Sequence, residues 1–156
     1  MDTAIRYLVT LPARYLSFLQ DIALLIVRVY VGWQFWKAGV IKLQAWDSTV
    51  FLFQYEYQVP LLSPNLAAML GTFGELFFPA LLFIGLTGRL AALGLSFVNI
   101  MAVIAYSHVI FSAGFEDSVT DHWVWGLMML TVMALGPGKL SVDYLLNRLK
   151  GEPGRY

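Results

Sequence analysis

A single acidic residue interrupts a long apolar stretch of this chain. Glu75 is the one charged side chain in residues 57–86, and such a stretch exceeds the roughly 20 residues that a helix needs to cross a bilayer. A carboxylate at membrane depth is costly, so it normally faces the protein interior, has a partner and marks a site. The stretch therefore predicts a membrane-spanning helix that turns Glu75 toward neighbouring helices.

The composition of the chain indicates that lipid is its solvent. Of 156 residues, 59% are hydrophobic and 13% are charged, whereas a soluble domain is about 25% charged. The net charge is zero, so nothing indicates a nucleic-acid partner. The absence of cysteine excludes disulfides, thiolate metal ligands and dithiol–quinone chemistry within this chain.

Hydropathy predicts an all-α fold, an integral membrane four-helix bundle in a single domain over 1–156. The segment 46–62 is aromatic and is broken by Pro60 and Pro64, so we expect an interfacial helix or lid there rather than another span. Gly136-Pro137-Gly138 ends the last span, and Ser141 caps a short amphipathic tail, 142–150. The four predicted spans are 19–43, 65–86, 89–111 and 119–135.

Basic residues in the short loops predict the orientation. Arg6 and Arg14 precede the first span, Arg89 follows the second, and Lys139, Arg148, Lys150 and Arg155 follow the fourth. The loop before the fourth span is acidic. We therefore expect a multi-pass protein of a bacterial inner (plasma) membrane with both termini in the cytoplasm. Lys37 and Lys42 run against this rule, and Lys42 is interpreted as snorkelling to the interface.

Helix rise places several polar residues at comparable depths. Counted from the outer face at about 1.5 Å per residue, Glu75 lies about 16 Å deep, Asn99 about 18 Å, Arg28 about 22 Å and Lys37 about 9 Å. We expect Arg28 and Lys37 to bracket Glu75, Arg28 as a bidentate donor and Lys37 as a proton carrier or ligand contact. Two interpretations stay open, which are a structural ion-pair network and a functional site.

Histidines and aromatic residues gather toward the outer face. His108 and His122 have acidic neighbours, so they are candidate metal or haem ligands, or else they cap helix ends and bind water. In the predicted topology all five tryptophans, including Trp33 and Trp36, fall in the outer half of the membrane. Tyr106 lies in the same half. This distribution is typical of an aromatic belt, and its asymmetry favours a flat apolar ligand.

Several short motifs, in this order and spacing, resemble the DoxX family of small four-span bacterial membrane proteins. The matching segments are 25–32, 37–42, Gly74-Glu75, 85–89, His108 and 136–143. Arg28, Lys42, Glu75 and His108 fall on motif positions. The resemblance implies a four-span fold. Some members of this family are subunits of a thiosulfate–quinone oxidoreductase, and others are linked to membrane redox complexes or to the maturation of metal-binding peptides.

These observations favour two functions over a third, transport of a small solute or proton, which would need an oligomer of this four-span chain. In the first, the protein is a redox-linked membrane subunit with a quinone between its helices. The quinone ring would lie against Trp33, Trp36 and Tyr106, its carbonyls would meet Lys37, His108 or Glu75, and Arg28 and Asn99 would line the site. In the second, the protein is a non-catalytic anchor or assembly partner. Both predict contact with the bilayer and either a protein partner or a homo-oligomer, and quinone, haem and metal are the candidate cofactors.

Overall fold

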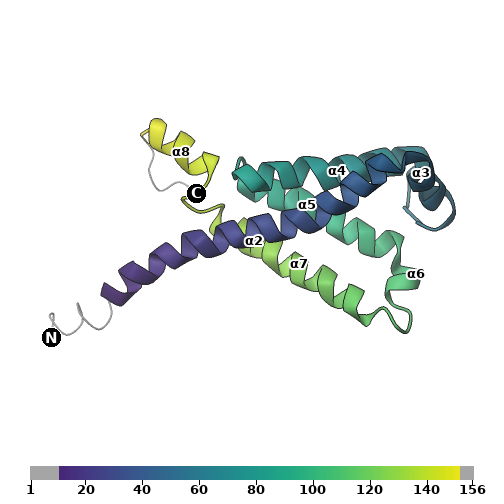
Figure 1. The fold of residues 1–156 in the computed structure, drawn as a ribbon, viewed down its shortest axis with the longest axis horizontal. Helices are drawn as coiled ribbons and strands as arrows, with labels where there is room; N and C mark the ends of the chain where they lie inside the picture. The colour runs from purple at the N-terminus through teal and green to yellow at the C-terminus, as the bar shows by residue number, and fades with distance from the viewer. Residues whose placement is uncertain (1–10, 152–156) are drawn as a thin grey trace.

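The computed structural model describes residues 11–151, with backbone alone for residues 11–15 and 17. Within this part of the chain every regular element is a helix, so the predicted all-α fold class is confirmed (Figure 1). Arg6 and Arg155, on which the predicted orientation partly rests, lie outside the described residues, and so does the side chain of Arg14. The elements are α2 (Leu11–Gln44), α3 (Trp46–Tyr55), α4 (Pro64–Ile84), α5 (Gly88–Ala105), α6 (Ser107–Ile110), α7 (Glu116–Leu135) and α8 (Val142–Leu149).

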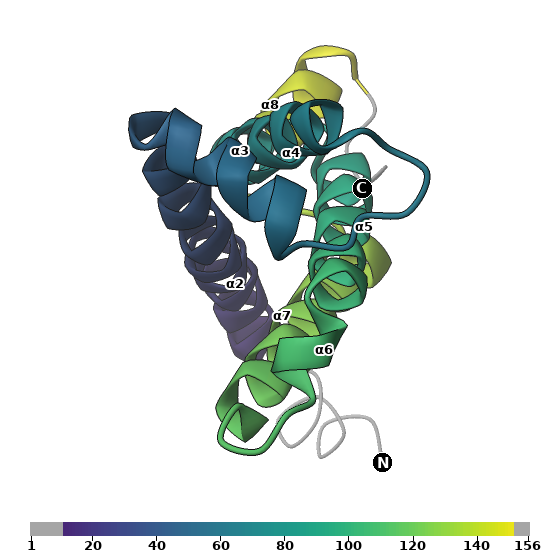
Figure 2. The ribbon, with the colours of Figure 1, turned by 90° about the vertical axis from the view of Figure 1, so that its right-hand side faces the viewer.

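The four long helices form an up-and-down bundle. Helix α4 packs between α2 and α5, and α7 packs against both α5 and α2, so the four close into a ring with antiparallel neighbours (Figures 1 and 2). Helices α3 and α6 lie at one end of the bundle, here called the α3 end, and α8 lies at the other, the α8 end. The core between the helices contains Val31, Phe35, Leu82, Leu95 and Met129.

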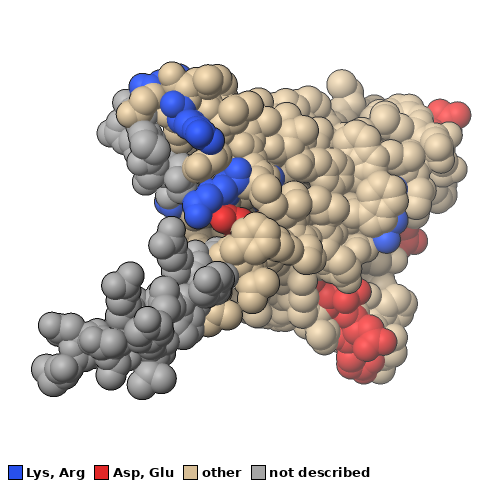
Figure 3. All heavy atoms as spheres, turned by 60° about the vertical axis from the view of Figure 1, so that its left-hand side comes forward, with Lys and Arg blue, Asp and Glu red and all other residues tan. Residues whose placement is uncertain are grey.

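The burial pattern is that of a protein dissolved in lipid. Arg28, Glu75 and Asn99 are buried, whereas large apolar side chains are exposed along every long helix. In Figure 3 the charged side chains gather at the two ends of the molecule, with an uncharged band between them. Hydrocarbon is the solvent that tolerates such a surface. The exposed apolar residues include Ile26, Phe73, Leu93, Phe97, Leu127 and Leu130.

Three helices are long and apolar enough to cross a membrane. They are Phe18–Gln44 within α2, Pro64–Ile84 and Gly88–Ala105. Helix α7 has a similar length, but its first turns carry Glu116, Asp117 and Asp121, which shorten its apolar part. The chain is therefore a multi-pass membrane protein, and a fourth span at α7 stays a prediction.

At the α3 end two of the long helices, α2 and α5, give way to short ones. Helix α2 stops at Gln44, and the Thr49 hydroxyl of α3 donates to the carbonyl of Lys42 (3.1 Å), which satisfies one of the free carbonyls at the helix end. Helix α3 packs against α2 and α4 and crosses the end of the bundle (Figure 2). The third predicted span, 89–111, is interrupted at Tyr106, where α5 gives way to α6.

At the α8 end a carboxylate fixes the tail to the bundle. Asp143 accepts hydrogen bonds from the backbone N–H groups of Thr87 (2.7 Å) and Gly88 (2.8 Å), so it caps the start of α5. Its own N–H donates to the carbonyl of Gly85 (3.0 Å). Gly85 adopts a left-handed conformation (φ 68°) that ends α4. Ser141 caps α8, as predicted, by accepting from the N–H of Tyr144 (3.2 Å).

Candidate functional site

A groove with a mostly apolar wall lies between α5 and α7. It has a volume of about 440 Å³, and its polar side chains are Ser96, Asn99 and His122. Trp123 and Leu127 at its edge are 71% and 60% exposed, so the groove opens on the apolar exterior. The rest of the wall is apolar and includes Ile100, Val103, Ile104, Leu130 and Met133.

A glycine on α7 keeps the groove open beside its polar wall. A Cβ atom added at Gly126 would have one neighbour within 4 Å, the side-chain nitrogen of Asn99 at 3.8 Å. The missing side chain therefore leaves the amide of Asn99 uncovered on that side. A larger residue at this position would project into the groove without a backbone clash.

Asn99 and His122 form a double hydrogen bond across the groove wall. The side-chain nitrogen of Asn99 lies 3.1 Å from the backbone carbonyl of His122, to which it donates. The Asn99 Oδ1 atom lies 2.7 Å from Nδ1 of the imidazole. Asn99 is buried (6% exposed), so this pair joins α5 to α7 where water cannot compete.

The ring of His122 is also held from the bundle interior. It meets the ring of Trp125 edge-on, with centroids 5.0 Å apart, and Trp125 meets Phe35 of α2 in the same way at 5.4 Å. Three helices thus fix the imidazole before any ligand arrives. Such preorganisation is what a binding group needs.

A second buried polar group joins α2 to α4. The Lys42 ammonium lies 2.5 and 2.6 Å from the two carboxylate oxygens of Glu75, and the two side chains are 19% and 9% exposed. The expectation that Arg28 and Lys37 bracket Glu75, and that Lys42 snorkels, is therefore wrong. The end of α2 lies level with the middle of α4, because α3 packs alongside the first half of α4.

Arg28 performs a different task near the α8 end. Its side chain is fully buried and donates to the carbonyls of Leu82 (2.8 Å) and Leu140 (2.6 Å). Leu82 lies seven residues beyond Glu75 on α4, which is about 10 Å along the helix axis. The guanidinium thus joins the end of α4 to the segment that leads into α8, and it does not reach Glu75.

Pro79 leaves a backbone carbonyl of α4 without its helical hydrogen-bond donor. A proline has no N–H, so the main-chain carbonyl of Glu75 lacks its usual helical donor four residues later. Helix α4 nevertheless continues through Pro79, which is buried. The spacing of Glu75 and Pro79 is a signal in the sequence that the prediction of the site did not use.

At the α3 end an aromatic cluster lies near the ion pair of Lys42 and Glu75. Tyr57 meets Tyr106 edge-on at 5.1 Å and Phe53 at 4.9 Å, and Tyr106 meets the ring of His108 at 5.5 Å. Burial, together with the nearby Tyr106 and Glu75, raises the pKa of the Tyr57 phenol. His108 is exposed on α6.

Two of the predicted ligand contacts line the groove, and the others lie outside it. Asn99 and His122 line the groove, whereas Trp33 (51% exposed) lies on the outer face of α2 and Trp36 packs on Phe83 with ring centroids 5.8 Å apart. Lys37 is exposed and has no ion pair within residues 11–151. In the same part of the chain no group of three His, Cys, Asp or Glu residues is placed to hold a metal ion.

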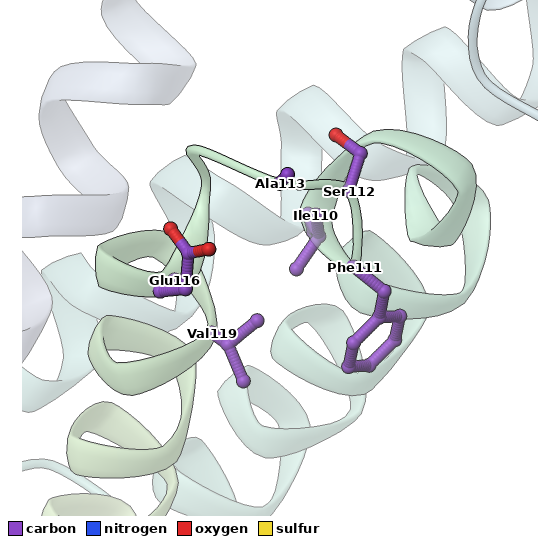
Figure 4. A pocket seen from close by; sticks show the side chains of 6 residues that line it. All are labelled: Ile110, Phe111, Ser112, Ala113, Glu116 and Val119. Atoms are coloured by element: carbon purple, nitrogen blue, oxygen red, sulfur yellow. The ribbon is translucent and has the colours of Figure 1, made fainter.

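A smaller hollow adjoins the groove at the turn between α6 and α7. It has a volume of about 350 Å³ and shares Ile110, Phe111 and Val119 with the groove (Figure 4). The carboxylate of Glu116 accepts from the N–H of Gly114 (3.1 and 3.2 Å). Hydrogen bonds from the backbone N–H groups of Glu116 and Gly114 lower the pKa of this carboxyl, which is committed to the turn.

Buried polar pairs inside a bundle with an apolar exterior define an α-helical membrane protein. The DoxX family model matches residues 23–108, more than half of the chain, so the protein belongs to the DoxX family. It is also similar to an uncharacterized protein of Haemophilus influenzae, at 26% identity over 135 residues, which covers 82% of this chain and 85% of that protein. No solved structure matches. His122 lies beyond the matched residues.

Proposed function

We propose that this protein is a redox-linked membrane subunit that binds a quinone in the groove between α5 and α7. One observation carries the proposal. The Asn99–His122 pair forms a fixed polar spot in the wall of a mostly apolar groove that opens on the apolar exterior. The volume of about 440 Å³ falls in the range of small-molecule sites, about 300 to 1,000 Å³.

The chemistry of a quinone matches this arrangement. A quinone is an apolar ring with two oxygens, and it dissolves in the bilayer, so it would enter sideways past Trp123 and Leu127. Its ring would lie on apolar wall residues while one oxygen meets the polar pair. The proposal moves the binding position away from Trp33, Trp36 and Lys37, which do not line the groove.

Under this proposal electrons pass between the bound ligand and another protein. The chain has no cysteine, and we find no flavin, nicotinamide or iron–sulfur motif in its sequence. The protein would therefore act as the quinone-binding subunit of a larger oxidoreductase. Catalytic roles for Glu75, His108 and Lys37 stay predictions, and their positions outside the groove do not support contact with this ligand.

A variant whose new side chain fills the groove tests the proposal directly. Purified protein in lipid nanodiscs is titrated with a short-chain benzoquinone and a short-chain naphthoquinone, and the quenching of tryptophan fluorescence reports binding. Gly126→Leu should weaken binding by about tenfold or more, because the new side chain occupies the groove. Ala134→Leu adds similar bulk to an exposed position of α7 outside the groove. Equal affinities for Gly126→Leu and Ala134→Leu would reject the site.

A second function, a non-catalytic anchor or assembly partner, is favoured by the contacts of the buried charges. Glu75 forms an ion pair, and Arg28 donates to two backbone carbonyls, although its Nε atom is buried without a partner in the described residues; such contacts between helices are what a structural network requires. Glu75→Gln should then lower thermal stability in detergent without changing the activity of the native complex. Affinity purification from membranes that recovers no partner would count against this function.

We also propose that the termini face the cytoplasm and that the membrane is the bacterial inner membrane. In support, the exposed basic residues Arg89, Lys139, Arg148 and Lys150 follow α4 or α7, whereas Glu116, Asp117 and Asp121 begin α7. Short loops rich in Lys and Arg stay inside. Because the natural chain lacks cysteine, Ser112→Cys and Lys150→Cys can be labelled separately with an impermeant maleimide in spheroplasts. Labelling of Lys150→Cys alone would contradict this orientation.

A further inference from the structure

We infer that the groove selects the hydroxyl-bearing, reduced form of its ligand, a quinol, over the carbonyl-bearing quinone. The inference rests on the proposed function and deepens it, since it names the chemical form that the site is built to hold. It follows from the hydrogen-bond directions at Asn99 and His122.

The backbone fixes the orientation of the Asn99 amide. A main-chain carbonyl can accept but cannot donate, so the group that faces the carbonyl of His122 at 3.1 Å must be the amide nitrogen of Asn99. The amide oxygen then faces Nδ1 of the imidazole at 2.7 Å. An amide oxygen can only accept, so Nδ1 must carry the proton.

The proton position determines what His122 offers to a ligand. In a neutral imidazole with a proton on Nδ1, the other nitrogen, Nε2, has a lone pair and no proton. In the part of the chain that the structure describes, the hydrogen bond of the His122 ring is the one at Nδ1, and Nε2 has no partner there. Because Nδ1 is occupied by Asn99, Nε2 is the nitrogen of the neutral His122 ring that is left for a ligand in the groove, and in this form it can only accept a hydrogen bond.

The other polar atoms of the groove complete the pattern. Asn99 uses one amide hydrogen on the His122 carbonyl, which leaves its second N–H as a donor near Gly126. The hydroxyl of Ser96 donates to the carbonyl of Ala92 (2.8 Å), so its oxygen is left as an acceptor. The groove therefore offers two acceptors and one donor.

A hydroxyl group fits this set and a carbonyl does not. A ring hydroxyl can donate to Nε2 of His122 and accept from the amide of Asn99. A quinone oxygen can accept from Asn99, but it places its lone pair against that of Nε2. A lipid acyl chain would satisfy neither atom, and an unpaired polar group at this depth is costly.

The test compares three ligands that share one ring and ring substituents, and that differ only at the two ring oxygens, on wild-type protein. Under anaerobic conditions, nanodiscs are titrated with the quinone, with its quinol and with the dimethyl ether of that quinol, which lacks the hydroxyl hydrogens. The quinol should bind about tenfold more tightly than either of the others, because it alone pairs with Nε2. Asn99→Leu frees the imidazole to adopt either tautomer, so the preference should fall to about twofold or less.

The outcomes separate this inference from the proposed function. A quinol preference that the dimethyl ether does not share, and that Asn99→Leu removes, supports the inference. Equal binding of quinol and quinone, or tighter binding of the quinone, overturns the inference and leaves quinone binding in place. Failure of all three ligands to bind, with phospholipid retained in the groove, overturns both.

Discussion

Two polar pairs lie inside this bundle, and they differ in what they leave unused. Lys42 and Glu75 join α2 to α4, and they bind each other through both carboxylate oxygens. Asn99 and His122 join α5 to α7, but they leave one ring nitrogen and one amide hydrogen without a partner in residues 11–151. A pair that satisfies itself holds helices together, whereas a pair with spare hydrogen-bonding groups beside a groove is prepared for a ligand.

The largest effect on stability is predicted at the pair of Lys42 and Glu75. Lys42→Met should lower the free energy of unfolding by about 3–5 kcal/mol, because it leaves the buried Glu75 carboxylate without a counter-charge. Thermal unfolding in detergent, followed by circular dichroism, measures the change. Lys37→Met, at an exposed lysine on the same helix, is the matched control and should change stability little.

Removing both charges of the pair tests the same explanation. The double variant Lys42→Met with Glu75→Leu should recover to within about 1 kcal/mol of the wild type, since an apolar pair of similar size often replaces a buried ion pair without loss. A double variant that unfolds as early as Lys42→Met would show that the pair does more than balance charge.

A somewhat smaller effect is expected at Arg28. Arg28→Met should cost about 3 kcal/mol, because two charge-assisted hydrogen bonds to the carbonyls of Leu82 and Leu140 are lost. Limited proteolysis should then cut between α7 and α8 sooner than in the wild type. Arg89→Met removes an exposed arginine of α5, so digestion of both variants at one rate would argue against this role.

A substitution in the pair of Asn99 and His122 should affect ligand binding more than stability. His122→Phe keeps the ring contact with Trp125 but removes Nε2, so quinol affinity should fall about tenfold, with a stability loss of about 1–2 kcal/mol from the unpaired Asn99 oxygen. Fluorescence titration and thermal unfolding measure the two quantities separately. Loss of stability with unchanged affinity would place the ligand elsewhere.

The smallest effect is predicted at the α3 end. His108→Ala removes an exposed ring whose aromatic neighbour is Tyr106, so quinol affinity should change by less than about twofold and stability by less than about 0.5 kcal/mol. The same titration checks this value against His122→Phe. A greater loss of affinity in His108→Ala would move the site from the groove to the aromatic cluster.

Much of this arrangement could be predicted residue by residue. The apolar stretch around Glu75 predicted a buried carboxylate in a helix, and the structure buries it in α4. Asn99 and His122 were both candidate ligand contacts. Their pairing was not predicted, because His122 was interpreted with His108 as an outer-face group. The choice of Arg28 and Lys37 over Lys42 failed because depth was counted from the ends of the predicted spans.

By itself, the sequence determined the solvent, the helical fold, the family and the depth at which a carboxylate must find a partner. The family follows from the order and spacing of short motifs, and the other properties follow from composition and from a fixed rise per residue, which describe position along one axis. Tertiary structure alone decided which lysine meets Glu75 and which asparagine orients His122. Helix rotation and the offset between neighbouring helices are set by packing across the whole bundle, and no local pattern records them.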